Sequence, residues 1–312
     1  MGLSATAELL ADGGAAAVSD DFFRSRAFLE AERVTHTLRL AGDRREALVP
    51  LIVREVEGTD RVDAISPYGY PGATVEGGGA APAASGVDWA ATGLVSVFAR
   101  ERLGGDSWLA DARERSGVLV HDPALERRVR PRLAEQVRAN ERDGWAVDSV
   151  AGPESPTVDR DAFAAAYEQT MRRAGAAERY FFARSYFDSV LGFQPSWLIS
   201  ARRGGEVGAA AIAAVSDGVL HYYLGGTADA ARDASPFKNV VIAMLDLADR
   251  LELPLNLGGG VTAGDGLEGF KRGFANGELP FRTHEVVCDP AGYERLAAGR
   301  DAGRFFPAYR AG

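Results

Sequence analysis

The side chains best suited to directing a charge at a single atom are the two lysines of this sequence. Lys238 and Lys271 stand alone, because every other one of the 35 basic residues is arginine. An ammonium on a flexible stem is a compact point charge, whereas a guanidinium is planar and binds in a fixed fork. The two lysines are therefore candidates for a functional site. The alternative is that both are ordinary exposed residues of helices.

Several other chemistries lack the residues to carry them. Cys288 is the single cysteine, which excludes an intramolecular disulfide and a site with several cysteine ligands. The four histidines (His36, His121, His221 and His284) show no metal-ligand spacing. No Ser-His-Asp arrangement is recognisable, and Cys288 fits a small core residue better than a nucleophile. We therefore expect neither a metal, nor a bound cofactor, nor a covalent acyl-enzyme.

Composition indicates an ordinary globular protein of two domains. The chain has 312 residues, of which 46% are hydrophobic and 25% charged. Its net charge of -9 argues against non-specific coating of nucleic acid but leaves room for a local basic groove. No apolar run approaches the ~20 residues that span a bilayer, and residues 1–17 lack the basic start of a secretory signal. We expect a cytoplasmic protein.

The second half of the chain shows the clearer order of elements. We expect helices over 159–175 and 184–191, then antiparallel strands over 197–202, 207–215 and 219–224. A loop opens at residues 225–227. Ser235 as N-cap and Pro236 at the first position then begin a helix that runs to Arg250. A strand over 255–257, a glycine run, a helix over 267–274 and a strand over 283–287 follow.

The first half repeats this order more weakly. We expect a helix over 21–31, strands over 35–40, 47–56 and 62–65, a Gly/Pro-rich loop over 66–86, a helix over 87–103 and a strand near Trp108. A helix over 123–142 bridges the halves, and a strand over 145–150 begins the second sheet. In each half a strand leads through a glycine-rich loop into a helix, whose amides suit an anionic or carbonyl oxygen.

This element order resembles the GNAT acyltransferase fold, and its duplication resembles the Fem family of aminoacyl-tRNA-dependent transferases. The most specific segments are residues 257–260 and 266–274, supported by residues 66–72, 167–173, 180–182 and 221–227. The resemblance covers most of the chain. It implies a mixed α/β fold of two tandem GNAT-like domains, over residues 1–147 (acceptor side) and 148–312 (catalytic side), with a cleft between them.

The resemblance also implies a role for the pair Phe270-Lys271. In the Fem family a Phe-Lys pair of the last helix lies at the reacting carbonyl, where an ammonium stabilises the oxyanion that forms during aminolysis. Phe270 would orient the lysine and exclude water, although core packing explains it too. No general base is evident. Asp265 and Glu268 could accept a proton, but acidic residues are ordinary at a helix start.

The donor follows from a departure within residues 229–239. GNAT enzymes that use acyl-CoA hold its pyrophosphate with an Arg/Gln-x-x-Gly-x-Gly/Ala loop, whereas this segment carries Ser-Pro-Phe-Lys. The change favours an aminoacyl ester on tRNA and makes Lys238 a candidate for binding the donor. The arginines of residues 127–138 are the best local basic surface for a tRNA backbone. A solvated helix face is the favoured interpretation of that run, because Pro131 interrupts it and Glu126, Glu135 and Glu141 dilute its charge.

Acceptor recognition is expected in the cleft between the halves. The candidate substrate-binding residues, besides Lys238, are Tyr68, Tyr70, Tyr222, Tyr223, Thr227, Asn256 and Arg172. The tyrosines offer hydroxyls and flat surfaces, and an arginine can grip a carboxylate or phosphate. Half-buried strand tyrosines and a solvated arginine cluster are the alternatives.

Three functions remain open at this point. The first is transfer of an aminoacyl group from aminoacyl-tRNA to an amine of a peptide or a small biosynthetic acceptor. The second is N-acyl transfer from acyl-CoA or a carrier thioester. The third is a non-catalytic module that binds a ligand in the cleft.

Overall fold

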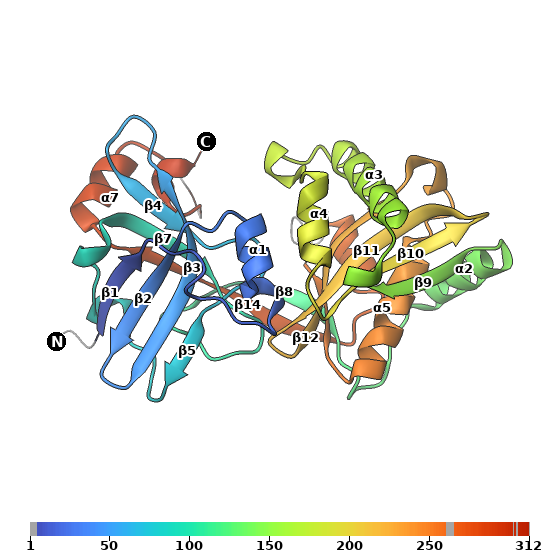
Figure 1. The fold of residues 1–312 in the computed structure, drawn as a ribbon, viewed down its shortest axis with the longest axis horizontal. Helices are drawn as coiled ribbons and strands as arrows, with labels where there is room; N and C mark the ends of the chain where they lie inside the picture. Colours follow the sequence, from blue (N-terminus) through green and yellow to red (C-terminus); the bar gives the residue numbers. More distant parts are fainter. Residues whose placement is uncertain (1–4, 260–264, 302, 304, 312) are drawn as a thin grey trace. The chain divides into compact units, whose positions relative to one another are not determined.

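The computed structural model describes residues 5–259, 265–301, 303 and 305–311, and the chain forms two compact units (Figure 1). The first unit comprises Met1–Ser19, Phe23–Ser116 and Pro280–Gly312, and the second comprises Asp20–Phe22 and Gly117–Leu279. Each combines a mixed sheet with helices, which confirms the expected α/β class. Among the described helices, none has the length and apolar character needed to cross a bilayer.

The first unit is built on the strand order β6-β1-β2-β3-β4-β7-β14, with β5 paired to β3. Its strands are β1 (Ala5–Leu10), β2 (His36–Gly42), β3 (Arg45–Glu55), β4 (Val62–Ile65), β5 (Thr74–Gly77), β6 (Val87–Asp88), β7 (Leu94–Arg100) and the end of β14 (Gly277–Val287). β4 pairs with β7, and β1 with β6, in parallel; the other pairs are antiparallel. The helical segments are η1 (Phe22–Arg24), α1 (Arg26–Ala31), η2 (Ala84–Gly86), η3 (Ala90–Thr92), α7 (Pro290–Ala297) and η7 (Ala308–Arg310).

The second unit carries the strand order β8-β13-β12-β11-β10-β9. These strands are β8 (Arg113–His121), β9 (Ala146–Ala151), β10 (Ser196–Arg203), β11 (Glu206–Ser216), β12 (Val219–Thr227) and β13 (Leu255–Gly258). The helices are α2 (Pro131–Arg142), α3 (Thr157–Arg173), α4 (Arg184–Leu191), α5 (Phe237–Leu251) and α6 (Gly266–Lys271), with short turns η4 (Gly152–Glu154), η5 (Glu178–Tyr180) and η6 (Asp229–Ala231).

Both faces of the second sheet are covered. Residues 208–214 of β11 are buried without interruption, the pattern of a strand with helices on each side. α5 packs on β9 to β12 with Met244 and Leu245 in the core, while α3 packs on β11 and β12 (Figure 1). Leu133 of α2 joins the same core as Phe274. The predicted boundary after residue 147 therefore differs from the observed division, because α2 belongs to the second unit and Pro280–Gly312 to the first.

The first half contains the largest error of the predicted elements. Residues 87–103 are not a helix but β6, η3 and the strand β7, in which Val95, Val97 and Ala99 are fully buried between β4 and β14. Trp108 lies in a loop rather than a strand, and β1, β5, β8 and α7 were not expected. The expected helix over 21–31 is divided at Ser25, whose hydroxyl caps α1.

In the second half the differences are confined to element ends. β12 continues through Thr227, where a loop was expected, because residues 225–227 pair with β11. α5 begins at Phe237 rather than at Pro236, and Ser235 adopts a left-handed φ of 49° instead of capping the helix. α6 ends at Lys271, and the bridging helix begins only at Pro131.

Candidate active site

A pocket of about 150 Å³ opens in the second unit beside the parallel strands β12 and β13. The two strands pair at Leu220–Leu255 and His221–Asn256. Farther along, Tyr222, Gly225 and Thr227 of β12 and Leu257 of β13 line the pocket. Its other walls come from the helices α3, α5 and α6.

Most of the pocket wall is apolar. Phe237 and Val241 of α5, Leu257 of β13, and Leu267 and Phe270 of α6 line it, with Phe274 fully buried behind them. The Phe270 ring packs edge-on to Phe274 at 5.2 Å between centroids. Phe270 therefore both lines the pocket and packs against the core, while its role in orienting Lys271 stays a prediction. Such a wall suits the hydrocarbon part of an acyl group.

Lys271 is the one charged side chain among the described residues that line this pocket. Its Nζ donates a hydrogen bond to the Gly259 carbonyl oxygen at 2.8 Å and lies 5.6 Å from the centroid of the Tyr222 ring. Burial lowers the pKa of Lys271 to about 8, against the opposing effect of Asp265. The ammonium is thus held, partly buried, at the wall of an apolar pocket.

Glycines allow this close approach. Gly258 has φ +76°, and a Cβ there would stand 3.0 Å from Lys271 Nζ. A Cβ at Gly225 would meet both the Phe237 ring and Tyr222 Oη at 2.7 Å. Gly258 and Gly225 are thus required on steric grounds. That the glycine run lines the site with backbone amides stays a prediction, and Gly260 lies outside the described residues.

The two adjacent tyrosines of β12 have different surroundings. Tyr222 lines the pocket, whereas the Tyr223 hydroxyl is hydrogen-bonded to that of Tyr186 and its ring packs on Phe22 at 5.1 Å. Neighbouring strand residues point to opposite faces, and a bulge between the pairs Ala213–Tyr222 and Ile212–Leu224 adds one residue here. Tyr223 is therefore a core residue and not part of this pocket.

Thr227 lines the pocket at the end of β12, and α3 holds its backbone. The Thr227 amide donates to Thr170 Oγ1 at 2.9 Å, and Arg173 donates to the Thr227 carbonyl at 2.7 Å. Thr170 is itself a lining residue. This arrangement fixes the strand end that carries the polar part of the pocket.

Asn256 serves the backbone rather than the cavity. It is buried, its Oδ1 accepts from the Gly258 amide at 2.7 Å, and its Nδ2 donates to His221 Nδ1 at 3.1 Å. Burial lowers the pKa of His221 to about 4, so this imidazole is neutral at ordinary pH. Asn256 thus shapes the turn that presents the Gly259 carbonyl to Lys271.

Lys238 and Arg172 do not line the pocket. Arg172 is exposed on α3 and pairs with Glu168 of the preceding turn at 2.6 Å. Lys238 is half-buried, and burial, together with the charge of Arg132 on α2, lowers its pKa. The structure therefore places Lys238 beside the arginine-bearing helix and not at the lysine of the pocket.

The two acids considered as proton acceptors already have structural partners. Asp265 caps α6 by accepting from the Glu268 amide at 2.7 Å. The Glu268 carboxylate pairs with Arg272 at 2.6 Å. Cys288 also drops out as a nucleophile, because burial raises the pKa of its thiol to about 12.

Tyr68 and Tyr70 belong to the first unit. The Tyr70 ring packs on Phe23 and Phe281, at 5.8 and 5.4 Å between centroids. Tyr68 is 40% exposed, and its amide donates to Glu32. That these tyrosines share a cleft with Tyr222 stays a prediction.

Reasoning from the sequence missed several lining residues, among them Thr170, Phe237, Leu267 and Gly225. Two signals were available. Thr170 lies in the segment 167–173 that carried the family resemblance, and Phe237 immediately precedes Lys238 at the start of α5. Neither residue was singled out as a site candidate, because only the folded chain brings α3 and α5 to the same strand end.

Comparison with known proteins defines the class of this structure. Residues 127–272 match the family model described as an acetyltransferase (GNAT) domain. That segment lies within the second unit and includes the whole pocket apart from Phe274. No curated protein sequence matches the chain. Residues 127–272 are accordingly similar to a GNAT acetyltransferase domain.

Solved structures then narrow the fold. FemX is similar with a TM-score of 0.59 at 12% identity, covering 91% of this chain and 96% of that one. The C-terminal domain of a putative lysylphosphatidylglycerol synthetase from Agrobacterium fabrum follows with a TM-score of 0.55, 12% identity and 88% of each chain. L-PGS from Bacillus licheniformis gives 0.52 at 12% identity, over 78% and 81%. The chain therefore has the Fem-type GNAT fold.

Proposed function

We propose that this protein transfers an aminoacyl group from aminoacyl-tRNA to an amine of a peptide or small biosynthetic acceptor. The observation that carries the proposal is the placement of Lys271. Its ammonium lies in an apolar pocket at the strand end and donates to the Gly259 carbonyl oxygen, and an ammonium carries three N–H donors in all. Such a group can meet an oxygen that becomes negative during the reaction.

In the proposed reaction the acceptor nitrogen attacks the carbonyl carbon of the ester. A C–N bond forms and the carbonyl oxygen becomes an oxyanion, which the Lys271 ammonium stabilises because the low local dielectric strengthens their attraction. The intermediate then collapses, the C–O bond to the ribose breaks, and that oxygen leaves as a hydroxyl. The proton lost by nitrogen balances the one that the leaving oxygen gains.

This scheme needs no dedicated base, metal or bound cofactor. An α-amino group has a pKa near ~8, so a useful fraction is neutral at ordinary pH. The apolar wall formed by Phe237, Leu257 and Leu267 would receive the side chain of the aminoacyl group. Tyr222 and Thr227 would contact its polar end.

The nature of the donor is the finer part of the proposal. The start of α5, where an acyl-CoA pyrophosphate would bind, has its early amides engaged: Asn239 and Val240 donate to the Pro236 carbonyl, and Lys238 to that of Ser235. This supports an aminoacyl-tRNA donor. The match to an acetyltransferase domain favours acyl-CoA as the second candidate. The likeness to the structures of FemX and L-PGS is a likeness of fold, and it does not distinguish the two donors.

One experiment separates the two donors. Radiolabelled aminoacyl-tRNA is offered with a panel of amines, with and without ribonuclease, beside a matched series with radiolabelled acetyl-CoA. The proposal expects amide product that ribonuclease abolishes. Product from acetyl-CoA that survives ribonuclease would overturn the tRNA donor and keep the acyltransferase, whereas no product from either donor would contradict both candidates.

Localisation and partners remain part of this proposal. We propose a cytoplasmic enzyme whose contact with tRNA is transient. The contact should be weak because one arginine of residues 127–138, Arg127, already pairs with Asp246 and Asp249 at 2.7 and 3.1 Å. The remaining positive surface comes from the exposed arginines Arg128, Arg130, Arg132 and Arg138, with Lys238 near Arg132. Activity should therefore fall steeply between low and moderate salt.

A further inference from the structure

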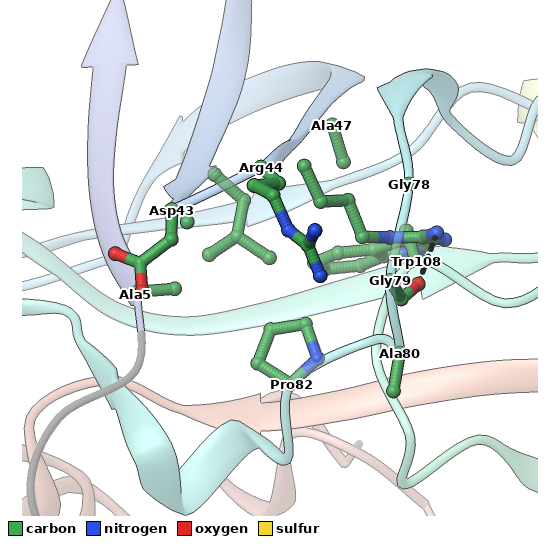
Figure 2. Close-up of a pocket in the computed structure, with 12 residues that line it drawn as sticks. Ala5, Asp43, Arg44, Ala47, Gly78, Gly79, Ala80, Pro82 and Trp108 are labelled. Atoms are coloured by element: carbon green, nitrogen blue, oxygen red, sulfur yellow. Dashed lines mark hydrogen bonds between the residues drawn. The ribbon is translucent and has the colours of Figure 1, made fainter.

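A second pocket, of about 240 Å³, lies wholly within the first unit (Figure 2). It is bounded by the turn between β2 and β3, which carries Asp43, Arg44 and Arg45, by the loop after β5, and by Trp108. Neither the GNAT domain match nor the proposed reaction assigns it a role, because the matched residues 127–272 all belong to the second unit.

Hydrogen-bond donors dominate the polar lining. Trp108 is fully buried, and its Nε1–H has no acceptor among the described residues. The Nε–H of Arg45 is buried and likewise lacks an acceptor there. Buried donors are rarely left unsatisfied in proteins, and an unmade hydrogen bond costs about 1–3 kcal/mol. Both donors belong to residues that line the pocket, so a ligand seated there is a candidate acceptor for them.

Arg44 and Arg45 differ in their burial and in their hydrogen bonds. Arg45 is fixed, since Nη1 donates to the Gly79 carbonyl at 3.1 Å and Nη2 to the Ser107 carbonyl at 3.0 Å. Arg44 is exposed, and Figure 2 shows its guanidinium among the lining residues. An exposed, permanently charged side chain such as Arg44, beside a fixed guanidinium such as that of Arg45, is suited to binding an anion from solvent.

The remaining lining limits the kind of anion. Leu40, Ala47, Pro82 and the Trp108 ring give the pocket an apolar side. Asp43 is the only acid among the described lining residues and would repel a multiply charged ligand more than a singly charged one. A carboxylate with an apolar body satisfies both conditions, because its two oxygens can accept from Arg44 and Trp108 while the body packs on the apolar side.

We infer that this pocket of the first unit binds a small organic carboxylate, with Arg44 and the indole N–H of Trp108 as its recognition groups. The inference is independent of the proposed transfer reaction. It concerns binding alone, and no bond of the ligand is made or broken.

Calorimetric titration of the full chain with benzoate tests the inference, with benzamide as the neutral analogue and inorganic phosphate as the multiply charged one. Benzoate should bind and benzamide should not. Arg44→Gln should weaken benzoate binding about tenfold or more, as expected for loss of a charge-assisted pair. Trp108→Phe keeps most of the ring and removes the N–H, so it should weaken binding about fivefold.

Two further variants make the test specific. Arg33→Gln removes an exposed arginine of the same unit that does not line the pocket, and should leave the Kd unchanged. Asp43→Asn removes the acid of the pocket and should tighten benzoate binding. Benzoate should also quench tryptophan fluorescence in the wild type but not in Trp108→Phe, although Trp89, Trp145 and Trp197 remain.

Three results would overturn the inference. The first is no benzoate binding up to about 10 mM, a concentration that detects even weak specific sites. The second is equal binding by wild type, Arg44→Gln and Trp108→Phe, which would place the ligand elsewhere. The third is phosphate binding without benzoate binding, which would make the site one for inorganic anions. Because Arg44 is exposed, its variant tests the inference even if Trp108→Phe fails to fold.

Discussion

The molecule holds positive charge in two pockets by opposite means. In the second unit the Lys271 ammonium is buried in an apolar wall, has one carbonyl acceptor, and has its pKa lowered to about 8. In the first unit Arg44 stands exposed at a pocket whose other donors are the indole of Trp108 and the fixed guanidinium of Arg45. A guanidinium stays charged at every accessible pH, whereas a desolvated ammonium does not.

This contrast separates reacting from binding. A buried ammonium is under-solvated in the resting protein, so it gains most when a negative charge forms beside it, as in the transition state of acyl transfer. An exposed arginine is already solvated and gains from a ligand that arrives with its charge complete. The same elementary charge thus suits catalysis in one pocket and recognition in the other.

The most severe test of the reacting pocket is Lys271→Met, which keeps the apolar stem and removes the charge. We expect kcat to fall about 10²–10³-fold, or ~3–4 kcal/mol, as for loss of one oxyanion donor. Arg272→Met is the matched control, because Arg272 is exposed on the same helix and pairs with Glu268. Comparable losses in both variants, measured with the donor identified above, would show that α6 contributes only structure.

Much of the second unit was predictable because its local signals agree with its packing. The apolar spacing of Phe163 and Tyr167 predicts α3, and Asp217-Gly218 predicts the turn between β11 and β12. Lys271, Phe270, Tyr222 and Thr227, chosen from separate segments, line one pocket. Agreement between local and tertiary preferences is what makes such reasoning succeed.

The first unit resisted the same reasoning where tertiary contacts override local pattern. Residues 94–99 are apolar apart from Ser96, which suits a buried helix or a buried strand, and periodicity alone does not separate the two. Pairing with β4 and β14 decides for strand. The placement predicted for Tyr223 and Asn256 differs from the structure for another reason. A bulge at Tyr223 and a buried turn at Asn256 direct these side chains away from the pocket. Such register effects leave no signal in a single sequence.

The burial of Lys271 should also be visible in the free energy of unfolding. The pKa of Lys271 in the folded chain, about 8, lies below the ordinary lysine value of 10.5, so the unfolded chain binds more protons between these pH values. Stability due to this group therefore rises with pH through that window and is lowest below pH 8. Lys271→Met should stabilise the protein by about 3 kcal/mol at pH 7, because pH 7 lies below both pKa values and each of the roughly 2.5 pKa units between them corresponds to ~1.4 kcal/mol.

Urea unfolding of wild type and Lys271→Met at pH 7 and pH 10 measures this difference. The gain should shrink toward zero at the higher pH, where the wild-type lysine is neutral in the folded state. Arg272→Met should show no such pH dependence, because Arg272 is exposed and keeps its charge. A gain that is equal at both pH values would mean that methionine packing, and not relief of a buried charge, stabilises the variant.

The pH dependence of the reaction distinguishes the two ways in which Lys271 can act. If its ammonium stabilises the oxyanion, kcat/KM should fall about tenfold per pH unit above pH 8, with an acceptor amine that is neutral throughout. If instead the neutral amine acts as a base, kcat/KM should rise through the same range. Lys271→Arg should abolish the fall above pH 8 at a lower overall rate, because guanidinium stays charged but places its donors differently.

The smallest effect is expected where the second pocket is altered in the absence of ligand. Arg44 is exposed, so Arg44→Gln should change the free energy of unfolding by less than about 0.5 kcal/mol at any pH between 6 and 10. Saturating benzoate should then stabilise wild type more than Arg44→Gln, because a ligand that binds only the folded state adds its binding free energy to stability. A loss above about 1 kcal/mol without ligand would instead assign Arg44 to the scaffold. Arg44 would then be a structural element of its pocket, and the assignment of a binding charge to the first unit would fail.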